Sequence, residues 1–176
     1  MKIFLLFLMF CLFGCHQQVE SKPFPKVVDV LKIKPDAADP GKEDPIKWQE
    51  RNINVLEKAK TEKKFVFMVV LTDSCGYCKI LKQRLESPEF AKLISDNFIP
   101  VLIDDSENTI LPQLFEGRTS YPTMFFVSHD RSLVQIAQGL GTTEQIRLFL
   151  VEAMVKQKLY NQLLEQTEEI ESAKNF

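Results

Sequence analysis

Apolar residues gather along this chain in solid runs that are separated by stretches with helical spacing. The runs at 65–71 and 98–103 are apolar on both alternations, which predicts strands buried on both faces of a sheet. Residues 78–97 carry apolar side chains at helical spacing, and Ser87 followed by Pro88 marks the cap and first turn of a second helix. This part of the chain therefore predicts two buried strands with helices between them.

A further helix is predicted before the first strand, over residues 44–64. Asp44 suits the N-cap of this helix and Pro45 suits its first helical position. One stripe of the helix is predicted to carry Trp48, Val55, Leu56 and Ala59. We therefore expect Trp48 to enter the core as a helical residue.

The second half of the chain predicts a short helix, a hairpin and a long final helix. Residues 110–115 form a short helical piece that closes at Gly117, and residues 121–139 form a strand, a polar turn and a second strand. Thr142 and Gln145 have the spacing of a capping box, which opens the last helix. The expected inner face of that helix comprises Ile146, Phe149, Leu150, Ala153 and Met154, with Leu159, Leu163 and Leu164 as further members.

This order of elements predicts an α/β fold. Alternating strands and helices favour a parallel core, and the final hairpin adds an antiparallel edge. We expect a central mixed sheet of four to five strands, flanked by helices, with an extended C-terminal helix. The uncertain fifth strand is the segment 27–33, which could dock on the domain edge or belong to a linker.

Composition and charge exclude several classes of function. The chain has 176 residues, of which 45% are hydrophobic and 26% charged, as expected for one globular domain with extra segments. Its formal net charge is −2, and it has neither a basic patch nor a glycine-rich phosphate loop. We therefore expect no nucleic-acid partner.

The N-terminus has the pattern of an export signal. Lys2 precedes the apolar run 3–13, which is shorter than the ~20 residues of a membrane-spanning helix but fits a signal-peptide core. The run ends in "LFGC", residues 12–15, which resembles the lipobox of bacterial lipoproteins, although Phe13 stands where that pattern usually has a small residue. The resemblance implies cleavage before Cys15 and attachment of diacylglycerol and an acyl chain such as palmitate to that cysteine. An ordinary cleaved signal peptide is the alternative.

The remaining domain boundaries follow from changes in composition. Residues 1–14 are the predicted signal peptide, and residues 15–45 are the predicted lipid-anchored tether, which is rich in proline. Residues 46–165 form the predicted folded domain, and residues 166–176 are a C-terminal tail or helix end. If the protein is anchored in this way, it belongs to the bacterial cell envelope and faces the periplasm. His16 follows the anchor cysteine where Asp would retain an enterobacterial lipoprotein at the inner membrane, which favours the outer membrane.

Cysteine chemistry centres on Cys75 and Cys78. Cys11 leaves with the signal and Cys15 becomes the anchor, so these two are the thiols left in an oxidising compartment. They follow a buried strand at the start of a helix, where unpaired N–H groups and the helix dipole stabilise a thiolate. Their spacing places Cys78 one turn behind Cys75, on the same face. We therefore expect Cys75 to attack and Cys78 to resolve the mixed disulfide.

The sequence "CGYCK" after a buried strand, together with "YPT" at 121–123, resembles the thioredoxin superfamily. The resemblance covers about residues 46–164 and implies a thioredoxin-like fold with a cis bond before Pro122. It also implies that Pro122 lies against the cysteines and that the backbone of Tyr121 binds the substrate chain. Gly76 and Tyr77, the residues between the cysteines, complete the expected substrate-binding set; the same dipeptide occurs in bacterial periplasmic disulfide isomerases.

Two residues depart from the thioredoxin pattern. Val69 stands where cytoplasmic thioredoxins have a buried acid, and Ser74 stands where they have tryptophan. The acid assists deprotonation of the second cysteine in those proteins. Proton transfer must therefore differ here, through Asp73, Glu57 or water.

A metal site is the main chemical alternative to redox activity. A cysteine pair binds zinc when two further ligands complete the set, and His16 and His129 are the histidines of the chain. One lies in the tether and the other in the predicted hairpin turn. We therefore expect no metal and no cofactor beyond a redox-active disulfide between Cys75 and Cys78.

These observations predict an exported thiol–disulfide oxidoreductase that acts on protein disulfides or thiols, with a reductase favoured. Its expected partners are protein substrates, an upstream membrane electron donor and, through the lipid anchor, the membrane. A non-catalytic thioredoxin-like binding module, a disulfide isomerase and a reductase for one partner are the alternatives. No residue fixes the direction of electron flow, which depends on the potential of the pair.

Overall fold

The computed structural model of the chain describes residues 45–52, 54–107, 109–115 and 120–174. The elements in order are α2 (Asn54–Glu62), β1 (Val66–Leu71), α3 (Gly76–Leu85), α4 (Pro88–Asn97), β2 (Ile99–Asp104), α5 (Ile110–Leu114), β3 (Thr123–Val127), β4 (Leu133–Gln138) and α6 (Thr143–Lys174). This order confirms the predicted α/β alternation, the hairpin and the extended last helix. Cys15, Asp44, Gly117 and the segment 27–33 lie outside the described residues. Among the described residues, no helix combines the length and apolar content that crossing a bilayer requires.

The four strands form one mixed sheet in the order β2-β1-β3-β4. β1 runs parallel to β2 and antiparallel to β3, and β3 runs antiparallel to β4. In this register Leu71 pairs with Asp104, and Val70 pairs with Thr123. The carboxyl ends of β1 and β2 and the start of β3 therefore lie at the same end of the sheet. The segment with both cysteines leaves the sheet at this end.

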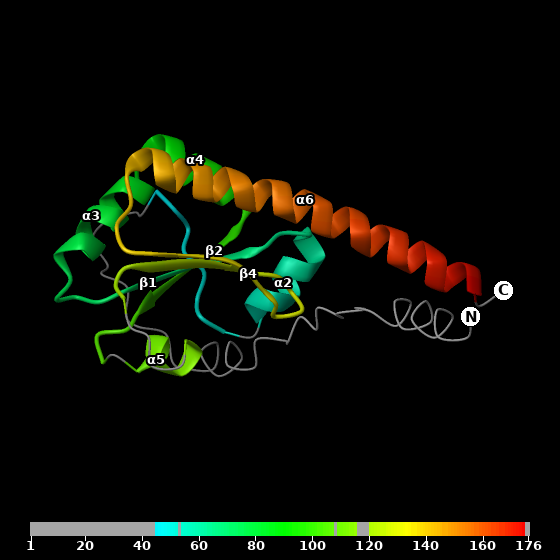
Figure 1. The fold of residues 1–176 in the computed structure, drawn as a ribbon, viewed down its shortest axis with the longest axis horizontal. Helices are drawn as coiled ribbons and strands as arrows, with labels where there is room; N and C mark the ends of the chain where they lie inside the picture. Colours follow the sequence, from blue (N-terminus) through cyan, green and yellow to red (C-terminus); the bar gives the residue numbers. More distant parts are fainter. Residues whose placement is uncertain (1–44, 53, 108, 116–119, 175–176) are drawn as a thin grey trace, which may run out of the picture.

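Helices cover both faces of the sheet (Figure 1). Val66, Met68 and Val70 of β1 face a core cluster with residues of α2 and α5. Phe67 and Val69 of the same strand face a second cluster with residues of α3, α4 and α6. β1 is buried at every position from Val66 to Val70, which explains why its sequence shows no polar alternation.

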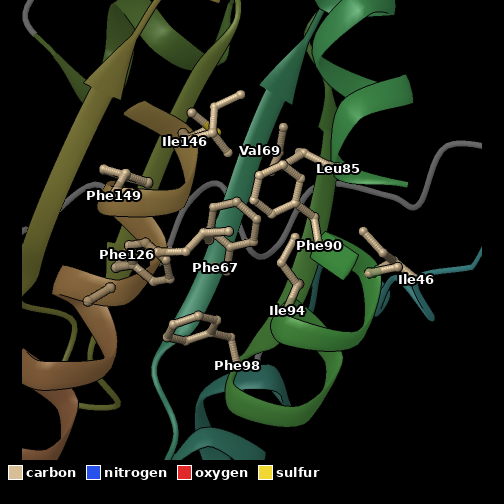
Figure 2. Packing of buried hydrophobic residues seen from close by; sticks show 14 of the residues in the cluster. Ile46, Phe67, Val69, Leu85, Phe90, Ile94, Phe98, Phe126, Ile146 and Phe149 are labelled. Carbon is tan, nitrogen blue, oxygen red and sulfur yellow. The ribbon is translucent and has the colours of Figure 1, made fainter. Parts of the chain in front are cut away.

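Aromatic packing dominates the cluster under α4 and α6 (Figure 2). The ring of Phe126 in β3 lies 4.9 Å from the ring of Phe67, 4.6 Å from Phe98 and 5.2 Å from Phe149, measured between centroids. These rings come from β1, the end of α4, and α6, so one side chain joins three elements. The contacts anchor the first half of α6 to the centre of the sheet.

The start of α2 corrects the sequence prediction. The helix begins at Asn54, not at Pro45, and the Asn52 side chain accepts a hydrogen bond from the Asn54 N–H at 3.0 Å. Gln49 instead pairs with β2, because its N–H donates to the Pro100 carbonyl at 2.8 Å. This pairing holds the segment outside any helix. Trp48 accordingly packs half-buried against the core from a non-helical segment and does not share a helical stripe.

Two predicted helix starts are confirmed. Pro88 is the first residue of α4 with Ser87 at the N-cap, although the Ser87 hydroxyl makes no capping hydrogen bond. At the start of α6, the Thr142 N–H donates to Gln145 Oε1 at 2.7 Å, and the Gln145 N–H donates to Thr142 Oγ1 at 3.2 Å. This reciprocal pair is the predicted capping box.

The inner face of α6 is shorter than predicted. Ile146, Phe149, Leu150 and Ala153 are buried as expected, whereas Leu159 and Leu163 are 55% and 63% exposed. Leu159 follows Leu150 by nine residues. Nine residues rotate the side chain by two and a half turns of the helix, so Leu159 points to the side opposite the buried face. The assignment of Leu159 and Leu163 to the core is therefore wrong.

Candidate active site

Cys75 occupies the N-cap position of α3. Its backbone is extended (φ −90°, ψ 107°), and its Sγ accepts a hydrogen bond from the Cys78 N–H at 3.1 Å. The first turn of α3 has no acidic side chain. An N–H group and the positive end of the helix dipole therefore both face the sulfur, and each favours a thiolate over a thiol.

Cys75 and Cys78 form a disulfide in this structure, with their Cα atoms 5.2 Å apart. Cys78 is buried in the first turn of α3, whereas Cys75 is partly exposed. An incoming protein can therefore reach Cys75 but not Cys78. This difference in access agrees with the expected order of attack and resolution.

α3 exposes an aromatic side chain next to Cys75. Tyr77 and Ile80 are among the exposed large hydrophobic residues of α3, and the Tyr77 side chain is 63% exposed. Gly76 is also exposed, and a Cβ at that position would meet no atom within 4 Å. The fold itself therefore does not require the glycine or the tyrosine between the cysteines.

The peptide bond between Tyr121 and Pro122 is cis, as the family resemblance implies. Pro122 is buried, and its carbonyl accepts a hydrogen bond from the Gly139 N–H at 2.8 Å. The next residue, Thr123, pairs with Val70 of β1. Because Cys75 follows Val70 by five residues, the cis-proline loop and the cysteines lie at the same end of the sheet.

Asp105 is a buried carboxylate at this end of the sheet that the sequence analysis did not identify. Its Oδ1 accepts hydrogen bonds from the N–H groups of Thr109 and Ile110 at 2.8 and 2.9 Å. Its Oδ2 accepts the Leu111 N–H at 2.9 Å and the Tyr121 hydroxyl at 2.7 Å. One side chain, 1% exposed, thus caps α5 and holds the residue that precedes the cis proline.

The hydrogen bonds of Asp105 determine its charge. Burial alone would raise the pKa of the Asp105 carboxyl, but the bonds from Leu111, Ile110, Tyr121 and Thr109 more than offset burial and hold that pKa below its usual value. Burial, followed by the bond to this carboxylate, strongly raises the pKa of the Tyr121 hydroxyl. Asp105 is therefore charged and Tyr121 neutral at physiological pH.

The residues around Asp105 also hold the loop that carries the cysteines. The Asp105 N–H donates to the Leu71 carbonyl at 2.8 Å, and the Asp73 N–H donates to Ser106 Oγ at 3.2 Å. The Ser106 hydroxyl in turn donates to Asp104. An acidic pair and a serine directly after a buried parallel strand would have pointed to this role, since the carboxyl ends of such strands commonly carry functional groups.

A small pocket lies behind Cys78. It has a volume of about 180 Å³, and its lining includes Cys78, Asp73, Asp104, Lys79 and Lys82. Val69, by contrast, is fully buried in the apolar cluster under α3, α4 and α6. The carboxylates of Asp73 and Asp104 thus line the same pocket as Cys78, whereas the position of Val69 offers no acid. In the part of the chain that the structure describes, no three His, Cys, Asp or Glu side chains gather as a metal site would require.

The comparisons with known proteins match this architecture. The family described as "Thioredox_DsbH: Protein of unknown function, DUF255" matches residues 39–175. A solution structure of a thioredoxin from Thermus thermophilus has a TM-score of 0.50 and 17% identity, and the match covers 59% of this chain and 84% of that one. That likeness shows a thioredoxin fold.

Two curated relatives match a shorter stretch. "Uncharacterized protein B0495.5" of Caenorhabditis elegans is 27% identical over 94 residues, which cover 49% of this chain and 13% of the relative. "Spermatogenesis-associated protein 20" of Mus musculus is 26% identical over 72 residues, which cover 40% of this chain and 9% of the relative. The chain thus spans only a small part of the length of these relatives.

Proposed function

This chain belongs to the Thioredox_DsbH family, and we propose that Cys75 and Cys78 carry out thiol–disulfide exchange with other proteins. The observation that carries the proposal is the position of Cys75 at the N-cap of α3, with the Cys78 N–H on its sulfur and its own side chain accessible. A structural disulfide would need neither the accessible sulfur nor the helix N-terminus.

The exchange proceeds in two displacement steps. The Cys75 thiolate attacks one sulfur of a substrate disulfide, so that a Cys75–substrate disulfide forms and the other substrate sulfur leaves as a thiolate that takes up a proton. The Cys78 thiol then loses its proton and attacks the Cys75 sulfur, which releases the second substrate thiolate. Two electrons pass to the substrate, and Cys75 and Cys78 become the disulfide. A dithiol donor restores the reduced pair.

The surroundings of the pair support protein substrates. Tyr77 lies two residues after Cys75 and exposes most of its aromatic side chain, which suits contact with an unfolded or extended polypeptide. Tyr121 comes just before β3, at the same end of the sheet as Cys75. We propose that the backbone of Tyr121 binds the substrate chain next to its reacting sulfur.

The proton of Cys78 needs a route that differs from the buried acid of thioredoxins. The pocket behind Cys78 is lined by Asp73 and Asp104 and opens to the surface. We propose that water in this pocket takes the proton from Cys78 when it attacks. The proton therefore does not pass through the position of Val69, which lies in the apolar cluster.

The cellular setting is proposed from the N-terminal sequence. Cys15 would carry the lipid anchor, the domain would face the periplasm, and a membrane electron donor would re-reduce the pair. Under these conditions the protein acts as a reductase in an otherwise oxidising compartment.

The reduction potential of the Cys75–Cys78 pair tests this proposal. We expect a value near that of thioredoxin, about −270 mV, from equilibration with glutathione and thiol trapping. A value near about −120 mV would instead make the protein an oxidant. A pair that does not exchange with glutathione at all would contradict the proposal and favour a non-catalytic binding module.

A further inference from the structure

α6 exposes a row of large aliphatic side chains along most of its length. The row consists of Leu148, Val151, Val155, Leu159, Leu163 and Ile170, whose exposed fractions lie between 44% and 63%. Large aliphatic side chains that gather on one exposed face often mark an interface. None of these residues contributes to the proposed thiol chemistry.

The row lies opposite the face of α6 that packs on the rest of the protein. Ile146, Leu150 and Ala153 are buried in the core. Further along, Gln157 Nε2 donates to the Asn97 carbonyl at 3.2 Å, and Asn161 Nδ2 donates to the Lys63 carbonyl at 2.8 Å. These contacts fix the rotation of the helix, so the aliphatic row points away from the sheet.

Apart from Val151, whose counterpart is Thr167, the spacing of the row is symmetric about Leu159. Val155 and Leu163 lie four residues to either side of it, and Leu148 and Ile170 lie eleven residues to either side. Eleven residues make about three turns of an α-helix, so these side chains stay on one face. The row therefore presents nearly the same apolar pattern when it is read from either end of the helix.

A symmetric row fits a second copy of itself in the antiparallel direction. In such a pair, Leu159 meets Leu159 on a twofold axis, Val155 meets Leu163, and Leu148 meets Ile170. Twofold interfaces of this kind bring the same surface patch of both subunits together. An unrelated partner would not require the symmetry.

Charge along α6 favours the antiparallel over the parallel direction. The last part of the helix carries four acidic residues and one basic residue: Glu165, Glu168, Glu169, Glu171 and Lys174. The part from 143 to 160 carries two acidic and three basic residues: Glu144, Glu152, Arg147, Lys156 and Lys158. A parallel pair would set the two acidic ends side by side, whereas an antiparallel pair sets each against the weakly basic half of its partner.

The part of the molecule that the structure describes leaves room for this pairing. Figure 1 shows α6 running along one side of the molecule, with its C-terminal part reaching beyond the sheet. Residues 148–170 of an α-helix span roughly 33 Å. Because the row faces away from the sheet, the two folded bodies would lie on opposite sides of the paired helices and would not collide.

We propose that α6 pairs in antiparallel fashion with α6 of a second copy of this chain, about a twofold axis at Leu159. The dimer brings together the exposed rows of both copies. Since the Arg84 side chain bonds the Gly141 carbonyl at 2.7 Å and so ties α3 to the start of α6, the two cysteine pairs lie at opposite ends of the paired helices. The proposal does not depend on the redox function.

Site-directed disulfide cross-linking tests the pairing and its direction. The full-length chain is used in mild detergent, with serine at Cys11, Cys15, Cys75 and Cys78, and with one new cysteine at a time. Leu159→Cys is expected to form a covalent dimer under mild oxidation, because the two sulfurs meet on the axis. Leu148→Cys and Ile170→Cys are each expected to stay monomeric alone and to cross-link when the two variants are mixed. Glu168→Cys, exposed on the opposite face of α6, serves as the matched control.

Two cross-linking results would overturn the proposal. If Leu159→Cys cross-links no faster than Glu168→Cys, the row does not pair with itself. If Leu148→Cys and Ile170→Cys each form homodimers as readily as Leu159→Cys, the helices pair in parallel.

Light scattering gives an independent measure of the pairing. We expect twice the monomer mass for the cysteine-free chain, and at least tenfold weaker self-association for Leu159→Lys with unchanged circular dichroism. A monomeric cysteine-free chain would also contradict the proposal.

Discussion

A Cys78→Ser chain is expected to accumulate mixed disulfides with substrate proteins, whereas a Cys75→Ser chain is expected to accumulate none. Cys75 is the accessible sulfur at the helix N-terminus, and Cys78 is buried behind it. Without Cys78 the first displacement still occurs, but the covalent intermediate then waits for an external thiol. Without Cys75 no accessible thiolate remains at the site. Acid quenching followed by non-reducing electrophoresis measures the difference.

The double variant Cys75→Ser with Cys78→Ser is the control for this experiment. It retains Cys11 and Cys15, so any adducts formed by the N-terminal cysteines appear in it as well. Multiple turnover in an insulin-reduction assay should disappear in both single variants, because each lacks one of the two displacements. Equal trapping by Cys75→Ser and Cys78→Ser would show that the roles of the two cysteines are wrongly assigned.

Replacing Asp105 by asparagine is expected to lower the free energy of unfolding by about 3 kcal/mol, or the melting temperature by roughly 10 °C. The carboxylate is the acceptor in all four of its hydrogen bonds, two at each oxygen. An amide group would replace one acceptor by a second donor, which leaves a buried N–H group without a partner. The Tyr121 hydroxyl would also lose its charged acceptor, so we expect slower reduction of insulin. Thermal unfolding and the insulin assay measure the two effects.

Asp104→Asn is a matched control at the adjacent position. The Asp104 carboxylate is exposed and uses one oxygen, Oδ1, to accept both the N–H and the hydroxyl of Ser106. Asparagine keeps such an oxygen, so stability should change by less than about 0.5 kcal/mol. A loss as large as that of Asp105→Asn would show that negative charge at this end of the sheet matters more than the buried hydrogen bonds.

The effect of Asp105 should also depend on pH. Its pKa is lower in the folded chain than the value of about 3.9 expected for an unfolded one. The unfolded chain therefore binds the proton first as the pH falls, and the carboxylate stabilises the fold fully above about pH 5. That contribution is lost as the pH falls below about 4, through the folded pKa. The stability difference between the native chain and Asp105→Asn should narrow over the same range.

Features that depend on neighbouring residues were predictable from the sequence. The buried strands, the cysteine pair at a strand-to-helix junction and the capping box of Thr142 and Gln145 each involve residues a few positions apart. The apolar run, the cysteine spacing and the cap residues each lie within one segment, so a local pattern contains them. The cis bond before Pro122 is not a local pattern, and it could be expected only from the family resemblance.

Features that depend on distant segments were predicted wrongly or missed. Pro45 and Trp48 suit a helix locally, but the bond from Gln49 to Pro100 of β2 keeps that stretch out of a helix. Asp105 gains its role from a tyrosine sixteen residues later, brought near by the antiparallel pairing of β3 with β1. The error at Leu159 is of another kind: nine residues after the buried Leu150, it lies half a turn from the inner face, which the helical period alone could have shown.

The pH dependence of alkylation at Cys75 tests the central claim most directly. The reduced chain is treated with iodoacetamide at a series of pH values, and mass spectrometry resolves the modification of Cys75 from that of Cys78. The helix N-terminus and the Cys78 N–H should place the midpoint for Cys75 below about 7.5, against about 8.5 for a free thiol, with Cys78 reacting far more slowly. A Cys75 midpoint near about 8.5, or faster modification of Cys78, would contradict the assignment of Cys75 as the nucleophile.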